Sequence, residues 1–184
     1  MAYLEHTKNF NTFMEVLLRD PERYRPIVEL RDIMTQHFDE LSWAECELIG
    51  AEISEQNGSE FCTGVRRGIA NALGGDESIL GQKKYQSLIR FSKKLNHNPG
   101  SITEADIQQI RDSGWSDQTI EDIIGLVAMT NVYNILAKGM GFAGVAESVF
   151  FKMGQATVAK RSYTALYQSF LEGAKGGSHA KTTV

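Results

Sequence analysis

Apolar residues recur every three or four positions along almost the whole chain. In the first such segment, 9–20, they are Phe10, Phe13, Val16 and Leu17, and in the next they are Ile27, Leu30, Ile33 and Met34. This spacing places apolar side chains on one face of a helix, whereas a half-buried strand would alternate apolar and polar residues. No alternating run of any length interrupts the pattern. The sequence therefore predicts an all-α bundle.

Helix start and stop signals locate the third and fourth helices. Ser42 followed by Glu45 is the pattern of a capping box, and it starts a helix that runs to about residue 56. The pair Asn57-Gly58 ends this helix, because both residue types tolerate the left-handed backbone that follows a helix end. Ser59 is a candidate N-cap for a fourth helix that reaches about residue 74. Because the link is short, the two helices should be antiparallel neighbours.

Similar signals predict further helices at about 88–95, 103–112, 116–139 and 144–172. A chain of 184 residues can bury its core in one domain without disulfides or metal. We expect a single helical domain over residues 1–173. The remaining segment, 174–184, is polar and glycine-rich, and it is predicted to be a disordered tail.

Composition excludes several classes of function. A formal net charge of -4 gives no basic face for nucleic acid. Two cysteines make no disulfide framework, and MAYLEHTKNF lacks the apolar segment of a signal peptide, so we expect a cytoplasmic protein. The most apolar region, 123–151, carries two asparagines, a lysine and a glutamate, and it is predicted to be buried in the protein and not to span a membrane. The four histidines, His6, His37, His97 and His179, do not have metal-site spacing, and neither a metal nor a cofactor is predicted.

The fourth predicted helix carries the residues with chemical potential. Ser59, Cys62 and Arg66 stand at i, i+3 and i+7, and therefore share one face. Cys62 is the third helical residue, where free N–H groups and the helix dipole favour a thiolate. Glu47 on the preceding helix should come close to it. This carboxylate could move protons for the thiol or form an ion pair with Arg66, and the sequence leaves both roles open.

The segment ECELIGAEISEQNGSEFCTGVRRGIA (45–70) resembles the signature of the alkyl hydroperoxidase D and carboxymuconolactone decarboxylase superfamily, the AhpD-like proteins. That signature is a glutamate, eleven residues, and then Cys-x-x-Cys-x-x-x-His across a helix-turn-helix. Over about residues 10–142 the chain resembles one group within this superfamily, the peroxidase-related proteins. This resemblance implies an all-α orthogonal bundle around the helix-turn-helix core and a homo-oligomer. Redox members use two thiols as an antioxidant pair, and decarboxylase members process a small lactone by acid-base chemistry.

Only two of the four signature positions match. Glu47 stands where the family has its glutamate and Cys62 where it has its second cysteine, whereas Ser59 replaces the first cysteine and Arg66 the histidine. A serine cannot form the disulfide that resolves a sulfenic acid, and an arginine cannot take a proton at neutral pH. Cys46 adjoins Glu47 but points about 100° away from it on the helix, so we do not expect it to supply the missing thiol.

Two hypotheses of function follow from these substitutions. In the first, the chain is a one-cysteine thiol peroxidase of weak activity: Cys62 attacks the peroxide, Arg66 stabilises its anion, Glu47 assists, and an external thiol resolves the product. This hypothesis predicts a lowered pKa for Cys62. In the second, the chain is a non-redox protein that binds a small molecule or acts on a lactone, with Glu47 and Arg66 lining a pocket and Arg66 holding a carboxylate. Structural roles also remain open, namely Cys62 as a buried apolar contact and Ser59 as an N-cap.

The C-terminal run 145–173 is more apolar than a monomer needs to expose. Its apolar residues are Val149, Phe150, Met153, Val158, Tyr163, Leu166, Tyr167 and Phe170. They are expected to pack on a neighbouring subunit or across the bundle of the same chain. The family resemblance implies dimers, trimers or hexamers, and the sequence does not choose among them.

Overall fold

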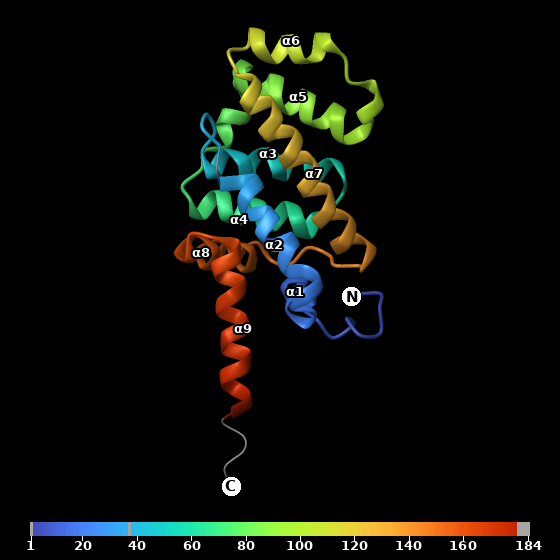
Figure 1. Cartoon of the computed structure of the whole chain (residues 1–184), viewed down its shortest axis with the longest axis vertical. Coiled ribbons are helices and arrows are strands. Elements are labelled where there is room, and N and C mark those ends of the chain that lie inside the picture. Colours follow the sequence, from blue (N-terminus) through green and yellow to red (C-terminus); the bar gives the residue numbers. More distant parts are fainter. Residues whose placement is uncertain (1, 37, 180–184) are drawn as a thin grey trace.

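The computed structural model describes residues 2–36 and 38–179, and within them the chain forms helices, turns and loops but no strand. The α-helices are α1 (Phe13–Arg19), α2 (Pro21–Gln36), α3 (Trp43–Gln56), α4 (Glu60–Ala72), α5 (Lys83–His97), α6 (Glu104–Asp112), α7 (Asp117–Gly139), α8 (Glu147–Lys160) and α9 (Tyr163–His179), with short 3-10 helices η1 (Glu77–Gly81) and η2 (Pro99–Ser101) (Figure 1). The predicted all-α architecture is confirmed.

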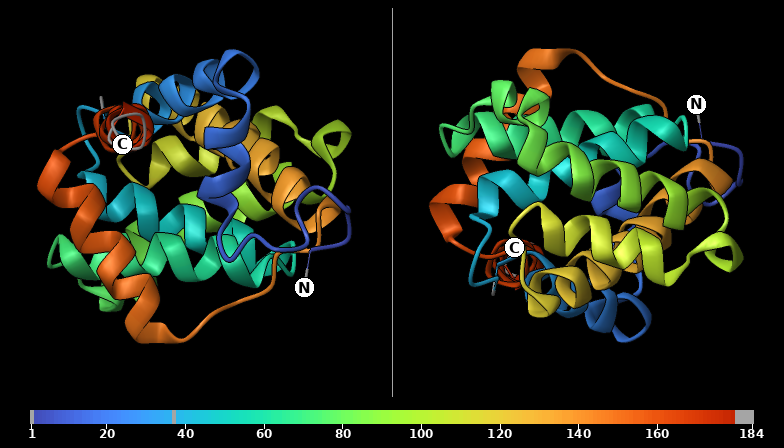
Figure 2. Two further views of the ribbon diagram at one scale, coloured as in Figure 1. Left: turned by 90° about the horizontal axis from the view of Figure 1, so that it is seen from below. Right: turned by 90° about the horizontal axis from the view of Figure 1, so that it is seen from above.

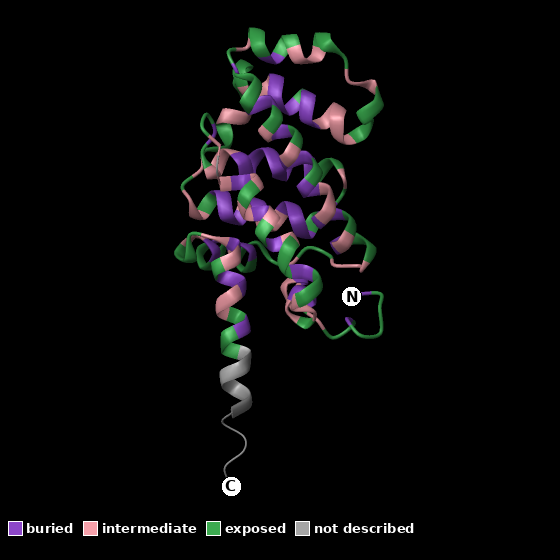
Figure 3. Cartoon of the chain, viewed as in Figure 1, coloured by how far each residue is buried: buried purple, intermediate pink, exposed green. Residues whose placement is uncertain are grey.

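The long helix α7 runs through the core of the bundle. It packs against α2, α3, α4, α5 and α6, and its side chains Ile123, Leu126 and Met129 are almost completely buried. Figure 3 shows where the buried residues lie along the ribbon. By length and composition alone α7 could cross a membrane, yet half of its most apolar window lies inside the bundle. A core helix of a folded domain can have the same length and composition, because much of its surface meets other apolar side chains.

The predicted turn between α3 and α4 is confirmed in detail. The Ser42 hydroxyl accepts a hydrogen bond from the backbone N–H of Glu45 at 3.3 Å, and the Glu45 carboxylate accepts one from the backbone N–H of Ser42 at 2.7 Å. Gly58 follows the end of α3 with φ of 60°, the left-handed conformation that glycine adopts without strain. The chain therefore reverses, and α4 packs back along α3.

Helix α8 lies directly across α4 (Figure 2). A Cβ atom added to Gly154 of α8 would fall 2.1 Å from the backbone oxygen of Gly68 on α4, so the two backbones touch at this point. The ring of Phe150 covers Gly64 in the same way, one turn earlier on α4. Small residues at these positions allow α8 to form one wall of the cavity described below.

The prediction of one continuous helix over 144–172 is wrong. Arg161 adopts a left-handed backbone conformation with φ of 56° and ends α8. A new helix, α9, starts at once because Asp32 of α2 caps it: the Asp32 carboxylate accepts hydrogen bonds from the backbone N–H groups of Tyr163 at 2.6 Å and Thr164 at 2.8 Å. This contact joins residues that are far apart in sequence, and a local pattern cannot contain it.

Helix α9 extends away from the body of the bundle (Figure 1) and runs to His179, beyond the helix end predicted at about residue 172. The predicted tail, 174–184, thus lies partly in α9, while residues 180–184 fall outside the described residues. Most of the apolar run 145–173 packs within its own chain, since Phe150, Tyr163, Leu166 and Tyr167 are buried there.

Candidate functional site

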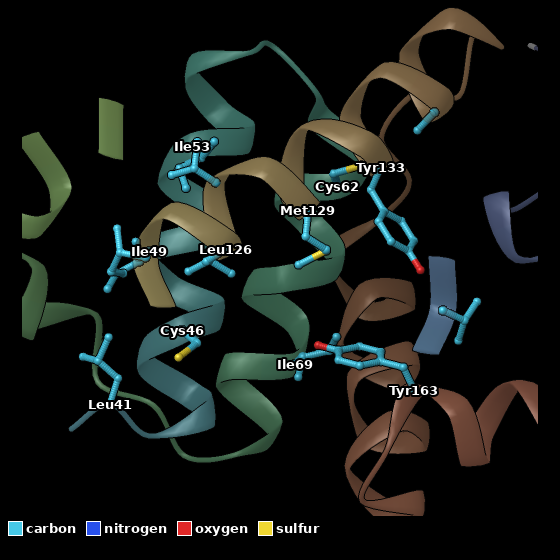
Figure 4. Packing of buried hydrophobic residues seen from close by; sticks show 14 of the residues in the cluster. Leu41, Cys46, Ile49, Ile53, Cys62, Ile69, Leu126, Met129, Tyr133 and Tyr163 are labelled. Carbon is cyan, nitrogen blue, oxygen red and sulfur yellow. The ribbon is translucent and has the colours of Figure 1, made fainter. Parts of the chain in front are cut away.

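A cavity of about 540 Å³ lies between α1, α4, α8 and α9, with α2 and α7 closing its inner end. Its walls are mainly apolar side chains from those first four helices. The titratable side chains of low exposure in its lining are Arg31, Cys62, Arg66, Tyr133 and Tyr163, and they define its inner end. Figure 4 shows Cys62, Tyr133 and Tyr163 together on one side of the core. Two of the four predicted site residues, Cys62 and Arg66, line this cavity, whereas Glu47 and Ser59 do not.

Glu47 lies behind the cavity wall, completely buried, and both its oxygens are engaged. One oxygen accepts hydrogen bonds from the Tyr163 hydroxyl and, at 3.2 Å, from the Trp43 indole N–H. The other accepts a hydrogen bond from Arg66 Nη1 at 3.1 Å, and Arg31 Nη2 lies 3.6 Å from it. Each oxygen of this carboxylate therefore already has a donor from the surrounding helices, which indicates a structural role in joining α3, α4 and α9.

Arg66 is the main partner of that carboxylate. Its Nη2 also donates to the Thr130 hydroxyl of α7 at 2.7 Å, so the guanidinium ties α4 to both α3 and α7. Gly50 makes room for it, because a Cβ there would come within 2.4 Å of Arg66 Nη1. Burial lowers the pKa of Arg66, and the Glu47 charge opposes this shift. The ion pair that the sequence left open is therefore present.

Arg31 of α2 is the charged residue of the site that the sequence interpretation missed. Its guanidinium carbon lies 4.0 Å from the ring centroid of Tyr163 and 5.0 Å from that of Tyr133. Although Arg31 is only 8% exposed, its Nε and Nη2 atoms find no hydrogen-bond partner among the described residues. Its contact with Glu47 at 3.6 Å is an ion pair without a hydrogen bond, so this buried guanidinium is less well neutralised than Arg66 and favours a further anion nearby.

The sequence contained a signal for Arg31. Of the apolar residues that predicted helix α2, Ile27, Leu30 and Met34 are partly buried against the core, whereas Ile33 is 58% exposed. The buried residues of α2 are Tyr24, Val28, Arg31 and Thr35. Their spacing of four, three and four residues is also helical. An arginine in such a stripe is the pattern that would have indicated a buried charge.

Cys62 is 7% exposed and forms part of the inner cavity wall. Burial raises the pKa of its thiol, while the Ser59 hydroxyl and the Arg31 and Arg66 charges act in the opposite direction without cancelling the shift. Ser59 occupies the N-cap position of α4, yet its buried hydroxyl forms neither a capping hydrogen bond nor another well-aligned hydrogen bond within the described residues. The lowered Cys62 pKa expected of a reactive thiol is thus absent.

The second cysteine is isolated from this cluster. Cys46 is completely buried on the other side of the core (Figure 4), and both cysteines are free thiols. Burial raises the pKa of Cys46 well above its ordinary value, and the neighbouring carboxylates of Glu47 and Glu45 raise it further. Cys46 is therefore an apolar packing residue.

Two asparagines of α7 have structural partners. Asn131 donates to Asn96 at 2.7 Å and accepts from Asn57 at 3.1 Å, which links α7 to α5 and to the end of α3. Asn134 accepts a hydrogen bond from Ser54 at 3.1 Å. Within residues 2–36 and 38–173, whose side chains the structure describes, no group of three His, Cys, Asp or Glu side chains is placed to hold a metal ion; His37 and His179 lie outside these ranges.

Comparison with known proteins identifies the fold. No protein-family model matches the sequence, and no curated protein matches it. An uncharacterized peroxidase-related protein from Silicibacter sp. TM1040 superposes with a TM-score of 0.65 at 21% identity, covering 73% of this chain and 76% of its own. Another uncharacterized peroxidase-related protein, from Ralstonia eutropha JMP134 and described as an alkylhydroperoxidase AhpD core, gives a TM-score of 0.63 at 22% identity, covering 76% of this chain and 78% of its own. The chain therefore has the fold that its sequence resemblance implied, the all-α AhpD-like fold of the peroxidase-related proteins.

Proposed function

We propose that this chain is a non-redox, small-molecule binding protein with the AhpD-like fold, and that it holds an organic anion at the inner end of its cavity. The observation that carries this proposal is the Arg31 guanidinium, which lines the cavity and has two buried nitrogens without a hydrogen-bond partner. A guanidinium pairs readily with a carboxylate, so a carboxylate ligand at this end of the cavity would neutralise a charge that Glu47 balances only at 3.6 Å.

The local charge balance supports an anionic ligand. Arg31 and Arg66 share one carboxylate, that of Glu47, and Arg66 has the shorter contact, 3.1 Å against 3.6 Å. Asp32 is the next residue to Arg31, but its oxygens are taken by the first turn of α9. Arg31 therefore remains the under-neutralised cation beside the cavity. The role of ligand clamp, which the sequence interpretation gave to Arg66, fits Arg31 better.

A one-cysteine thiol peroxidase is the second candidate, and the position of Cys62 in the cavity wall beside two guanidinium groups favours it. In such a reaction the thiolate attacks the peroxide, the O–O bond breaks to give a sulfenic acid and an alcohol, and an external thiol then reduces the sulfenic acid. The raised pKa of Cys62 and the saturated oxygens of Glu47 make this weaker than anion binding. A lactone enzyme that used Glu47 as its base would meet the same obstacle.

The test compares carboxylates with neutral analogues of the same shape. Calorimetry and thermal shift would be run on the wild type with small carboxylates and with their amides, and repeated on Arg31→Met, which keeps much of the side-chain volume. We expect carboxylates to bind the wild type and to lose at least about tenfold in affinity in the variant, as charge-assisted hydrogen bonds contribute about 1.5–3 kcal/mol. Equal binding of carboxylates and amides, or full binding to Arg31→Met, would contradict the proposal.

A further inference from the structure

The cavity changes in character from its inner end to its mouth. At the inner end Arg31 and Arg66 are 8% and 2% exposed. At the mouth the lining includes Val149 and Phe170, which are 40% and 44% exposed, together with the exposed Lys152. A ligand that satisfies both ends must be charged at one end and apolar along the rest of its length.

The walls between the two ends are apolar on all four sides. Helix α1 contributes Met14 and Leu18, α4 contributes Val65 and Ile69, and α8 contributes Met153. Unbranched Met and Leu side chains adapt to the shape of what they contact, which suits a flexible chain. The volume of about 540 Å³ is in the usual range for a small organic ligand, roughly 300–1,000 Å³.

The charged groups along this path do not compete with an apolar ligand. The Glu15 carboxylate already accepts hydrogen bonds from the backbone N–H groups of Asn11 at 2.7 Å and Thr12 at 2.8 Å, and so it serves to cap α1. Lys152 lies at the exposed rim, where its stem can cover apolar surface while its ammonium group stays in water.

We propose that the ligand is an unbranched, medium-chain aliphatic carboxylic acid, which binds head first with its carboxylate at Arg31 and its methyl end at Val149 and Phe170. This inference rests on the proposed function and specifies its ligand. A compact aromatic acid would satisfy Arg31 but would leave the apolar walls near the mouth in contact with water.

A chain-length series tests the inference directly. Affinities would be measured for butanoate, hexanoate, octanoate, decanoate and dodecanoate, with benzoate as the compact acid and the methyl esters as uncharged controls. We expect affinity to rise by up to about fourfold for each methylene group that enters the cavity, and then to level off when the chain reaches the mouth. Octanoate should bind more tightly than benzoate, and the esters should bind weakly.

Two outcomes separate this inference from the proposed function. If butanoate and benzoate bind through Arg31 but affinity does not rise with chain length, the aliphatic ligand is excluded and anion binding stands. If no carboxylate of any length or shape binds, both proposals fail.

A matched pair of variants tests the orientation of the chain. Phe170→Ala removes a half-exposed wall at the mouth, and we expect it to weaken dodecanoate binding by roughly fivefold while leaving butanoate unchanged. Phe151→Ala, an equally exposed position on α8 that does not line the cavity, should change neither. Equal losses for both ligands in Phe170→Ala would overturn the head-first orientation.

Cys62 supplies an independent readout in the folded protein. In a Cys46→Ser background, Cys62 is the one remaining thiol, and it shares the inner wall with Arg31. Saturating octanoate should slow its alkylation by a small thiol reagent at least about tenfold, whereas the methyl ester should not. Unchanged alkylation at saturating octanoate would place the ligand elsewhere and exclude this site.

Discussion

The two buried arginines differ in how well they are paired, and this difference decides their roles. Arg66 has a carboxylate partner at 3.1 Å and a hydroxyl partner at 2.7 Å. Arg31 has two aromatic rings against its guanidinium and a longer contact of 3.6 Å to the same carboxylate. Removing the Arg66 charge leaves the buried Glu47 carboxylate without its main counter-charge. Removing the Arg31 charge takes away a buried cation that is only partly neutralised.

The free energy of unfolding should therefore separate the two residues. We expect Arg66→Met to lose about 3–5 kcal/mol, because Glu47 is then left buried with Arg31 too far away for a hydrogen bond. Arg31→Met should lose no more than about 1 kcal/mol, since it removes a charge whose burial is itself costly. Denaturant unfolding of both variants gives the comparison, and equal losses would contradict this assignment of roles.

The reactivity of Cys62 follows from its raised pKa. Burial favours the neutral thiol of Cys62, so the pKa of this thiol is higher in the folded than in the unfolded chain. The stability that the buried neutral thiol contributes is present below the unfolded pKa and is lost as the pH rises through the folded pKa. In a Cys46→Ser protein we expect the alkylation rate of Cys62 to reach half its maximum above the ordinary cysteine pKa of about 8.5. Mass spectrometry after mild peroxide and a sulfenic-acid trap should show no adduct.

If the alkylation rate instead reaches half its maximum below the ordinary cysteine pKa, or if an adduct is trapped on Cys62, the thiol peroxidase is supported. Cys46 is the internal control in the wild-type protein, because it is buried on the other side of the core and does not line the cavity. Modification of both cysteines to the same extent would indicate unfolding and not specific reactivity.

Among the elements, those with local signals could be predicted from the sequence. The capping box of Ser42 and Glu45 and the Asn57-Gly58 turn placed α3 and α4 correctly, because each signal acts within a few residues. The break between α8 and α9 could not be predicted, because it depends on Asp32, about 130 residues away in sequence. The pairing of Arg31 with Tyr163 has the same long-range origin.

For Ser59 the sequence predicted the position correctly but not the hydrogen bond of its side chain. The sequence placed it at the start of α4, where it does lie, but its hydroxyl makes no capping hydrogen bond. The position of the helix start is a local property, whereas the direction of one side chain depends on what packs around it.

The crossing of α4 and α8 should be the packing contact most sensitive to a single methyl group. In Gly154→Ala the new Cβ would lie 2.1 Å from the Gly68 oxygen, a backbone atom that can move only with its helix. We expect a loss of about 1–3 kcal/mol in the free energy of unfolding, together with weaker ligand binding because α8 shifts. Gly139→Ala on α7, where nothing lies within 4 Å, is the control and should be neutral or slightly stabilising. A neutral Gly154→Ala would show that the two helices pack less closely.

For the whole molecule, three of the large apolar side chains that remain exposed in the described part of the chain lie on the core helices α2 and α7, and the others lie in the N-terminal segment and on α8 and α9. Ile33 on α2 and Ile124 and Ile135 on α7 are 58%, 42% and 69% exposed. Ile124 and Ile135 are eleven residues apart, about three helical turns, so they lie on one face of α7. Large apolar side chains grouped on a surface often mark a contact with another protein chain. The homo-oligomer expected from the sequence resemblance stays a prediction, and this surface is where we expect it to form.

Light scattering coupled to gel filtration measures the molar mass of the particle in solution. A chain of 20.5 kDa that associates through α2 and α7 should give a multiple of that mass, and Ile135→Lys should reduce the mass toward that of one chain. Lysine at a position this exposed should leave the folded chain intact, because it meets water in the separate subunit and is buried only in the complex. Val149→Lys, another exposed apolar position but on α8, is the control and should leave the mass unchanged. If Val149→Lys dissociates the particle while Ile135→Lys does not, the interface lies at the cavity mouth, and a second copy would then cover the entrance through which the ligand must pass.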